Sequence, residues 1–133
     1  MFEWSNTYSV GIGSIDAQHQ TLFAIGRELY AAMGSGKGET VVGRILDRLV
    51  QYTSVHFAHE ERLMRANGYA DFDAHKAAHD ELTRTVVKFQ QDFHTGRAVM
   101  TVQLLQFLKD WLQKHIKGSD LKYAPYLKAK QVA

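Results

Sequence analysis

Histidines and acidic residues in this sequence have a spacing that could bind a metal ion. The chain has 133 residues, seven of them histidine and none cysteine. His56 and Glu60 are four residues apart, and so are His75 and His79. On an α-helix such residues lie about 40° apart around the axis and about 6 Å apart along it. Each pair can therefore present two donor atoms to one point, which predicts a metal site built by helices.

Three further residues could complete this site, namely His19, His115 and Asp120. A separation of five residues would place His115 and Asp120 about 140° apart on one continuous helix. Gly118 offers a point where the helix can end, so that the chain bends and returns Asp120 to the centre. Seven donors are more than one six-coordinate ion needs, and far more than one tetrahedral zinc needs. Two ions bridged by Glu60 and Asp120 would use all seven.

The donor types restrict the metal and the chemistry. Imidazole-rich sites without thiolates suit iron, zinc, copper or nickel, whereas calcium and magnesium prefer oxygen donors. The sequence has no Glu-x-x-His motif of carboxylate-rich di-iron bundles, and Leu63 stands where a zinc-protease helix needs its second histidine. It also has no glycine-rich phosphate loop and no Gly-x-Ser-x-Gly motif. We expect His59 and His94 to be hydrogen-bonded core residues rather than metal ligands.

The elements that must position these donors are helices. Four segments of about 18 to 28 residues carry apolar residues at helical spacing, separated by glycine-containing breaks at Gly34–Gly38, Gly68 and Gly96. The single proline, Pro125, lies near the end of the chain, and no stretch alternates with a period of two. The predicted fold class is all-α, an antiparallel up-down four-helix bundle with an N-terminal extended arm.

Each of the four apolar stripes contains a histidine, and the second also contains Glu60. Burying an ionised carboxylate costs several kcal/mol unless it is paired or bound to a metal. A shared cation would remove this penalty for all the intruding polar groups at once. We expect one domain over residues 1–133, with an arm at 1–15 whose Phe2, Trp4, Tyr8 and Ile12 pack on the bundle, and a C-terminal segment at 118–133.

Composition and charge exclude several other classes. A formal net charge of +2 is too small for a protein that binds nucleic acid by neutralising phosphates. No apolar run approaches the roughly 20 residues of a membrane-spanning helix, and the N-terminus has no secretion-signal pattern. We therefore expect a cytoplasmic protein that neither binds nucleic acid nor inserts into a membrane, and we expect it to be a monomer.

These residues resemble those of the hemerythrin family, and in particular its single-domain bacterial members, the bacteriohemerythrins. The resemblance extends from the arm to the last predicted helix and misses no ligand position. The matching stretches are WSNTYSVGI at 4–12, IDAQH at 15–19, HFAHEERLM at 56–64, HKAAH at 75–79 and WLQKHIKGSD at 111–120.

The resemblance implies a cofactor of two non-haem iron ions, cycling between Fe²⁺ and Fe³⁺, that binds O₂ reversibly. By position, one iron would be held by the first group of imidazoles and the other by the second, with both carboxylates and an oxo or hydroxo group as bridges. The implied ligands are His75, His79 and His115 for the first iron, His19 and His56 for the second, and Glu60 and Asp120 for the bridges.

Reversible O₂ binding requires a dry pocket, because water and protons would release the oxygen as peroxide and leave the irons ferric. Four residues are placed to line such an oxygen pocket beside the ligands. Asp16, three residues before His19, has two possible roles, as a partner that orients a ligand or the arm, or as the N-cap of the first helix. The four expected pocket residues are Leu22, Phe57, Trp111 and Leu112.

The function expected from this resemblance is an oxygen carrier, store or delivery protein rather than an enzyme. A delivery role would imply an oxygen-consuming oxidase or oxygenase as partner. The alternatives are an oxygen or redox sensor, a di-iron enzyme of the peroxidase, nitric oxide or oxidase type, and an iron store. We favour the carrier because the predicted bundle accounts for these 133 residues and because high-valent oxygen chemistry usually needs more anionic donors.

Overall fold

The computed structural model describes residues 3–35, 38–96, 102–116 and 120–130. These residues form helices and connections, with no strand among them. The elements in chain order are the 3₁₀ turn η1 (Asn6–Tyr8) and the α-helices α1 (Gly13–Gly34), α2 (Glu39–Ala66), α3 (Phe72–His94), α4 (Val102–His115) and α5 (Leu121–Ala129).

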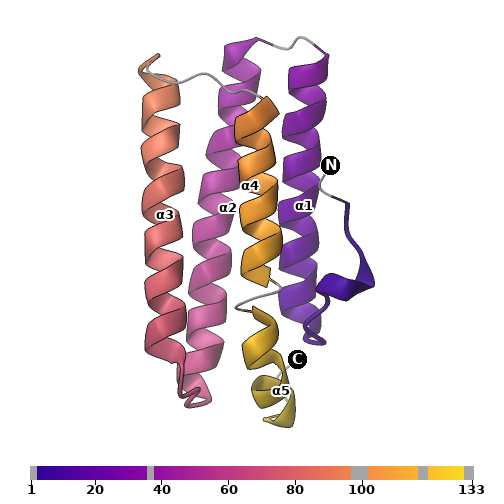
Figure 1. Ribbon diagram of the computed structural model, residues 1–133, viewed down its shortest axis with the longest axis vertical. Helices are drawn as coiled ribbons and strands as arrows, with labels where there is room; N and C mark the ends of the chain where they lie inside the picture. Colours follow the sequence, from indigo (N-terminus) through magenta and orange to yellow (C-terminus); the bar gives the residue numbers. More distant parts are fainter. Residues whose placement is uncertain (1–2, 36–37, 97–101, 117–119, 131–133) are drawn as a thin grey trace.

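The helices α1 to α4 lie side by side with alternating direction, and the short α5 continues beyond the lower end of α4 (Figure 1). This confirms the predicted four-helix bundle. The described part of α4 has 14 residues, and the residues directly before it, 97–101, lie outside the described residues. The C-terminal segment folds into α5 as far as Ala129. None of the described helices combines the length and the apolar character that a membrane span requires.

The buried apolar side chains form two clusters, one on each side of a polar layer. The larger cluster fills the body of the bundle and includes Leu22, Leu29 and Leu105. The smaller one lies where the arm, α5 and the ends of α2 and α3 meet, and it includes Ile15 and Met64. Along α1, α2 and α3 the predicted metal ligands fall between residues of these two clusters, so apolar packing holds the polar layer from both sides.

Two of the arm residues expected to pack on the bundle, Trp4 and Tyr8, contact α1, and Phe2 lies outside the described residues. The Trp4 and Tyr8 rings lie with their centroids 5.7 and 5.2 Å from the ring of Phe23. The carboxylate of Asp16 accepts hydrogen bonds from the Ser9 hydroxyl at 2.5 Å and from the Val10 N–H at 2.8 Å. Asp16 therefore anchors the arm and is not the N-cap.

Helix α1 begins three residues earlier than the predicted arm allows. Its first residue is Gly13, and the N-cap is Ile12, which has no side-chain capping bond. Asp16 lies in the first turn of the helix, where the partial positive charge of the helix end favours a carboxylate. The chain can turn into this helix because Gly11 has a φ of 75°, a value that side chains disfavour.

Candidate metal centre

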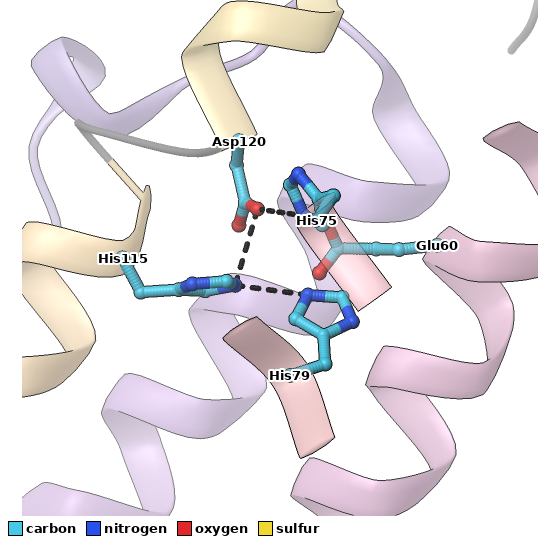
Figure 2. A group of neighbouring side chains, drawn as sticks. All are labelled: Glu60, His75, His79, His115 and Asp120. Carbon is cyan, nitrogen blue, oxygen red and sulfur yellow. Dashed lines mark hydrogen bonds and ion pairs between the residues drawn. The ribbon is translucent and has the colours of Figure 1, made fainter. Parts of the chain in front are cut away.

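The seven predicted donor residues meet at the end of the bundle near α5. Each of the five helices contributes at least one of them, and every one is buried, with at most 6% of its surface exposed. Figure 2 shows five of these side chains pointing toward one another. The donors are His19 on α1, His56 and Glu60 on α2, His75 and His79 on α3, His115 at the end of α4, and Asp120 at the N-cap of α5.

Asp120 lies at the middle of this cluster. Its Oδ2 is 3.0 Å from Nε2 of His19, and its Oδ1 is 3.1 Å from Nε2 of His75 and 3.2 Å from Nε2 of His115. Adjacent ligands of an ion that makes bonds of about 2.1 Å are themselves about 3 Å apart. The two oxygens of Asp120 therefore face different histidines at the separations that metal ligands require.

Residues 116–120 connect α4 to α5, and of these 117–119 lie outside the described residues. Helix α4 ends at His115, and α5 begins directly after Asp120. Gly118, the residue expected to end the helix, lies outside the described residues. The side chains of Asp120 and His115 nevertheless meet at the same centre, although their spacing would separate them on one continuous α-helix.

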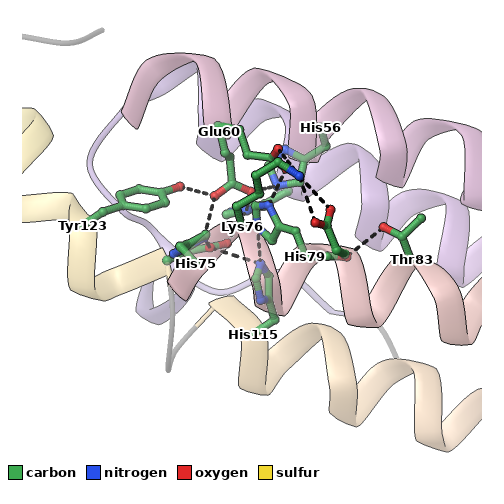
Figure 3. Close-up of polar contacts among 12 residues, drawn as sticks. His56, Glu60, His75, Lys76, His79, Thr83, His115 and Tyr123 are labelled. Atoms are coloured by element: carbon green, nitrogen blue, oxygen red, sulfur yellow. Dashed lines mark hydrogen bonds and ion pairs between the residues drawn. The ribbon is translucent and has the colours of Figure 1, made fainter. Parts of the chain in front are cut away.

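Glu60, like Asp120, places its carboxylate group among the histidines of the cluster. Its Oε1 contacts Nε2 of His56 and lies 3.8 Å from Nε2 of His19. Its Oε2 lies 3.8 Å from Nε2 of His75 and accepts a hydrogen bond from the Tyr123 hydroxyl at 2.6 Å (Figure 3). The two oxygens of Glu60 thus also face different histidines.

The donor atoms divide into two groups, each compact enough for one ion. Within each group the donor atoms lie within 4.8 Å of one another. The three-imidazole group consists of His75, His79 and His115 with both carboxylates, and the two-imidazole group consists of His19 and His56 with both carboxylates. Because Glu60 and Asp120 belong to both groups, the geometry can hold two ions with two bridging carboxylates.

The hydrogen bonding of these residues fits a bound cation. In the part of the chain that the structure describes, seven buried side-chain atoms have no hydrogen-bond partner, and all of them belong to this cluster. Such atoms are costly to bury unless a metal or a partner satisfies them. They are both ring nitrogens of His19, Nε2 of His56 and of His75, Oε1 of Glu60 and both carboxylate oxygens of Asp120.

The pKa shifts in the cluster arise from burial and from the charges of neighbouring donors. Although burial alone lowers it, the carboxylates of Asp120 and Glu60 raise the pKa of His19 to about 9. Although burial and Asp120 raise it, neighbouring imidazoles bring the pKa of Glu60 down to about 2. Burial lowers the pKa of His79 to about 3, which keeps its ring neutral. The carboxylates are thus ionised, and a cation would take the place of the proton on His19.

Two of the imidazoles have outer partners that orient them. The Nδ1 of His56 lies 2.7 Å from Oε1 of Gln18, and the Nδ1 of His79 lies 3.0 Å from Oε2 of Glu61. Amide and carboxylate oxygens only accept hydrogen bonds, so each Nδ1 carries the hydrogen. Nε2 of each ring is then left with its lone pair toward the centre, as metal binding requires.

Comparison with known proteins identifies the family. The model of the hemerythrin HHE cation-binding domain matches residues 10–127. This chain belongs to the hemerythrin family. A bacteriohemerythrin from Methylococcus capsulatus is 38% identical over 122 residues, which cover 92% of each chain. A hemerythrin-like protein from Naegleria gruberi is 34% identical over 122 residues, covering 92% of this chain and 90% of its own.

The fold comparison agrees with this assignment. The crystal structure of a wild-type hemerythrin matches with a TM-score of 0.89 and 36% identity, covering 94% of this chain and 96% of that one. The hemerythrin fold and the His/Glu/Asp cluster able to bind metal therefore occur together in this chain.

Three of the four expected pocket residues are buried beside the cluster. The ring of Phe57 stacks on His79, with centroids 3.8 Å apart and an angle of 3° between the planes. Leu22 and Leu112 line an apolar cavity of about 20 Å³ in the body of the bundle, and none of the seven donor residues lines it. The side chain of Trp111 lies outside the part of the chain that the structure describes.

His59 and His94 form hydrogen bonds outside the cluster, as expected, but neither is a core residue, because His59 is half-buried and His94 is exposed. Nε2 of His59 is 3.2 Å from the Ser14 hydroxyl, and Nε2 of His94 is 2.6 Å from Oδ1 of Asp47.

Sequence reasoning missed the outer contacts of Gln18, Glu61 and Tyr123. Each of these residues lies within three positions of a predicted ligand in the sequence. This proximity is too weak a signal to predict a contact without the fold.

Proposed function

We propose that this hemerythrin-family protein binds dioxygen reversibly at two non-haem iron ions and acts as an oxygen carrier, store or delivery protein. The observation that carries the proposal is the convergence of five imidazoles and two shared carboxylates into two adjoining donor groups. His75, His79 and His115 would hold one iron, and His19 and His56 the other, with Glu60 and Asp120 as bridges.

The two donor groups are unequal, and this inequality supports a binding role. The three-imidazole group offers five protein donors and the two-imidazole group only four. An iron in the smaller group keeps room for an external ligand, whereas its neighbour is nearly saturated. A pair of ferrous ions supplies the two electrons that dioxygen accepts when it binds reversibly. The names of the relatives, bacteriohemerythrin and hemerythrin, agree with this proposal.

The surroundings of the donors favour release of oxygen over its reduction. Leu22 and Leu112 are 2% and 4% exposed, and the cavity that they line is apolar. Such a lining excludes water and protons, which would otherwise convert bound oxygen to free peroxide. Phe57 covers one face of His79 and fixes the plane of its ring. The proposed role of these three residues is to keep the oxygen site dry.

The donor set also bears on the alternatives. Five neutral imidazoles supply less negative charge than the carboxylate-rich sites that support high-valent oxygen chemistry, so we place the enzymatic alternative second. A sensor would bind oxygen at the same site and differ in its partner. An oxygen-consuming oxidase or oxygenase remains the proposed recipient in a delivery role.

The deciding experiment is an absorption spectrum of the purified protein, first without and then with air, together with metal analysis. We expect two irons per chain, a visible band that appears with oxygen, disappears on deoxygenation and returns, and no net consumption of oxygen. Asp120→Asn should lose the band and most of the iron, while Asp110→Asn, an exposed position on α4, should lose neither. One iron or none in the wild type, or steady oxygen turnover, would contradict the proposal.

A further inference from the structure

The two donor groups differ in the chemistry of their outer partners. In the three-imidazole group, His79 directs its Nδ1 hydrogen to the carboxylate of Glu61. In the two-imidazole group, His56 directs its Nδ1 hydrogen to the amide oxygen of Gln18. The two contacts have similar lengths, 3.0 and 2.7 Å, so the main difference between them is the negative charge.

This charge changes the donor strength of the imidazole. A carboxylate that accepts the Nδ1 hydrogen pulls the proton toward itself and leaves more electron density on Nε2. A neutral amide does so less, because hydrogen bonds to ionised groups are roughly twice as strong as those between neutral groups. A more basic imidazole binds a divalent ion more tightly and favours its higher oxidation state.

The surroundings of Glu61 keep this contact in place. The ring of His79 cannot rotate freely, because Phe57 is stacked against its face. Glu61 is 19% exposed, and its Oε1 lies 3.9 Å from the ammonium group of Lys76. Lys76 is itself held by Asp80, whose Oδ2 is 2.8 Å away. Glu61 is therefore partly shielded from solvent. Burial raises the pKa of its carboxyl group, whereas the ammonium group of Lys76 opposes this shift and favours the anion that acts on His79.

We infer that Glu61 is a positioning residue that, through His79, makes the three-imidazole group the more electron-donating half of the centre. Gln18 leaves the two-imidazole group the less electron-donating half. The inference rests on the proposed function and deepens it, because it assigns the more readily oxidised iron to the half with more protein ligands.

The test compares Glu61→Gln with Asp80→Asn in the iron-loaded full-length protein. Both changes remove one negative charge beside Lys76, but only the first removes a carboxylate that touches His79. We expect Glu61→Gln to lower the affinity for one of the two irons by about 10- to 100-fold in a chelator competition. It should also raise the midpoint potential of the centre, while Asp80→Asn leaves the iron affinity within about twofold of the wild type and does not shift the potential.

The reciprocal variant Gln18→Glu keeps the length of the side chain and gives His56 a charged partner. We expect it to tighten the more weakly held iron and to lower the midpoint potential. In the double variant with Glu61→Gln the two potential shifts should oppose each other. Shifts of the midpoint potential in opposite directions for the two single variants would not arise if either residue had only a structural role.

Equal iron affinities and potentials in wild type, Glu61→Gln and Asp80→Asn would overturn the inference and leave the proposed function intact. Fewer than two irons in the wild type would overturn the proposed function. In that case a Zn²⁺ titration, which involves no redox chemistry, still measures the donor strength of His79. The same weakening of one site by Glu61→Gln alone supports the role of Glu61, and its absence contradicts that role.

Discussion

Two regions of this bundle, its apolar body and the donor residues near α5, bury their side chains to the same extent but are stabilised differently. In the half away from α5, residues such as Leu29, Leu46 and Leu105 are at most 1% exposed and contact other apolar side chains. At the end near α5, His19, Glu60 and Asp120 are equally buried but leave polar atoms without hydrogen-bond partners. Packing alone stabilises the first half. The second half needs a cation to offset the cost of its buried charges.

This difference shows how the same helices can serve folding and chemistry. Each stripe continues through both halves, and only the residue types change along it. The apolar residues on both sides of the donors supply the free energy that holds the helices together, and the donors are destabilising until metal binds. The two halves should therefore respond differently to mutation and to metal removal.

Metal removal should have the largest effect. We expect treatment of the loaded protein with a strong chelator to lower the melting temperature by about 10 °C or more, because metal at 1,000 times its dissociation constant contributes about 4 kcal/mol per site. Differential scanning calorimetry measures this shift. Asp120→Asn is the control, since a variant that has already lost its metal should change little. Equal melting temperatures of the wild type with and without chelator would show that the polar half is stable by itself.

A large-to-small change in the apolar half should destabilise the protein regardless of metal. Leu29→Ala is expected to lower the free energy of unfolding by about 2–5 kcal/mol, because it leaves a cavity in the packed body of the bundle. Urea titrations of the loaded and chelator-treated protein should give the same loss. The visible spectrum of the folded variant should match that of the wild type. A spectral change would mean that the two halves are not separable.

Leu112→Ala should sharpen the comparison, because Leu112 belongs to the apolar body, lines its cavity and stands one helical turn before His115. We expect the oxygenated form to decay several-fold faster by autoxidation, since a shortened side chain admits water to the site. The decay of the visible band in air measures this rate. Leu105→Ala, also buried on α4 but not lining the cavity, is the matched control. Equal decay rates in all three proteins would count against a water-excluding role.

The smallest effect is expected on the surface of the apolar half. Oδ1 of Asp47 on α2 accepts hydrogen bonds from the side chains of Gln90 and His94 on α3. Burial would raise the pKa of Asp47, but these two partners hold it below its usual 3.8. Its contribution is therefore present above pH 3.8 and is lost as the pH falls through the lower folded-state pKa.

For Asp47→Asn we expect a loss of less than about 1 kcal/mol at pH 7, because the pair is exposed to solvent. Urea denaturation of the two proteins at pH 7 measures the difference. A loss of several kcal/mol would show that this surface contact holds α2 and α3 together, and that packing of the apolar half does not.

Much of the fold and the donor set could be predicted because the signals are local. Helical periodicity depends on residues three or four positions apart, so the apolar stripes predicted four long helices. The pairs His56 with Glu60 and His75 with His79 share a helix face wherever that helix lies. The start of α1 at Gly13 was not predicted, because helix ends depend on contacts that sequence periodicity does not contain.

The sequence by itself determined which side chains could bind metal and on which helix faces they stand, since a helix turns by a constant angle per residue. Only the tertiary structure decided that Asp120 returns to the centre after α4 ends, that Glu60 and Asp120 each face both donor groups, and that Glu61 and Gln18 back different imidazoles. These contacts join residues on different helices. Their distances depend on how the helices pack, and packing is a property of the whole chain.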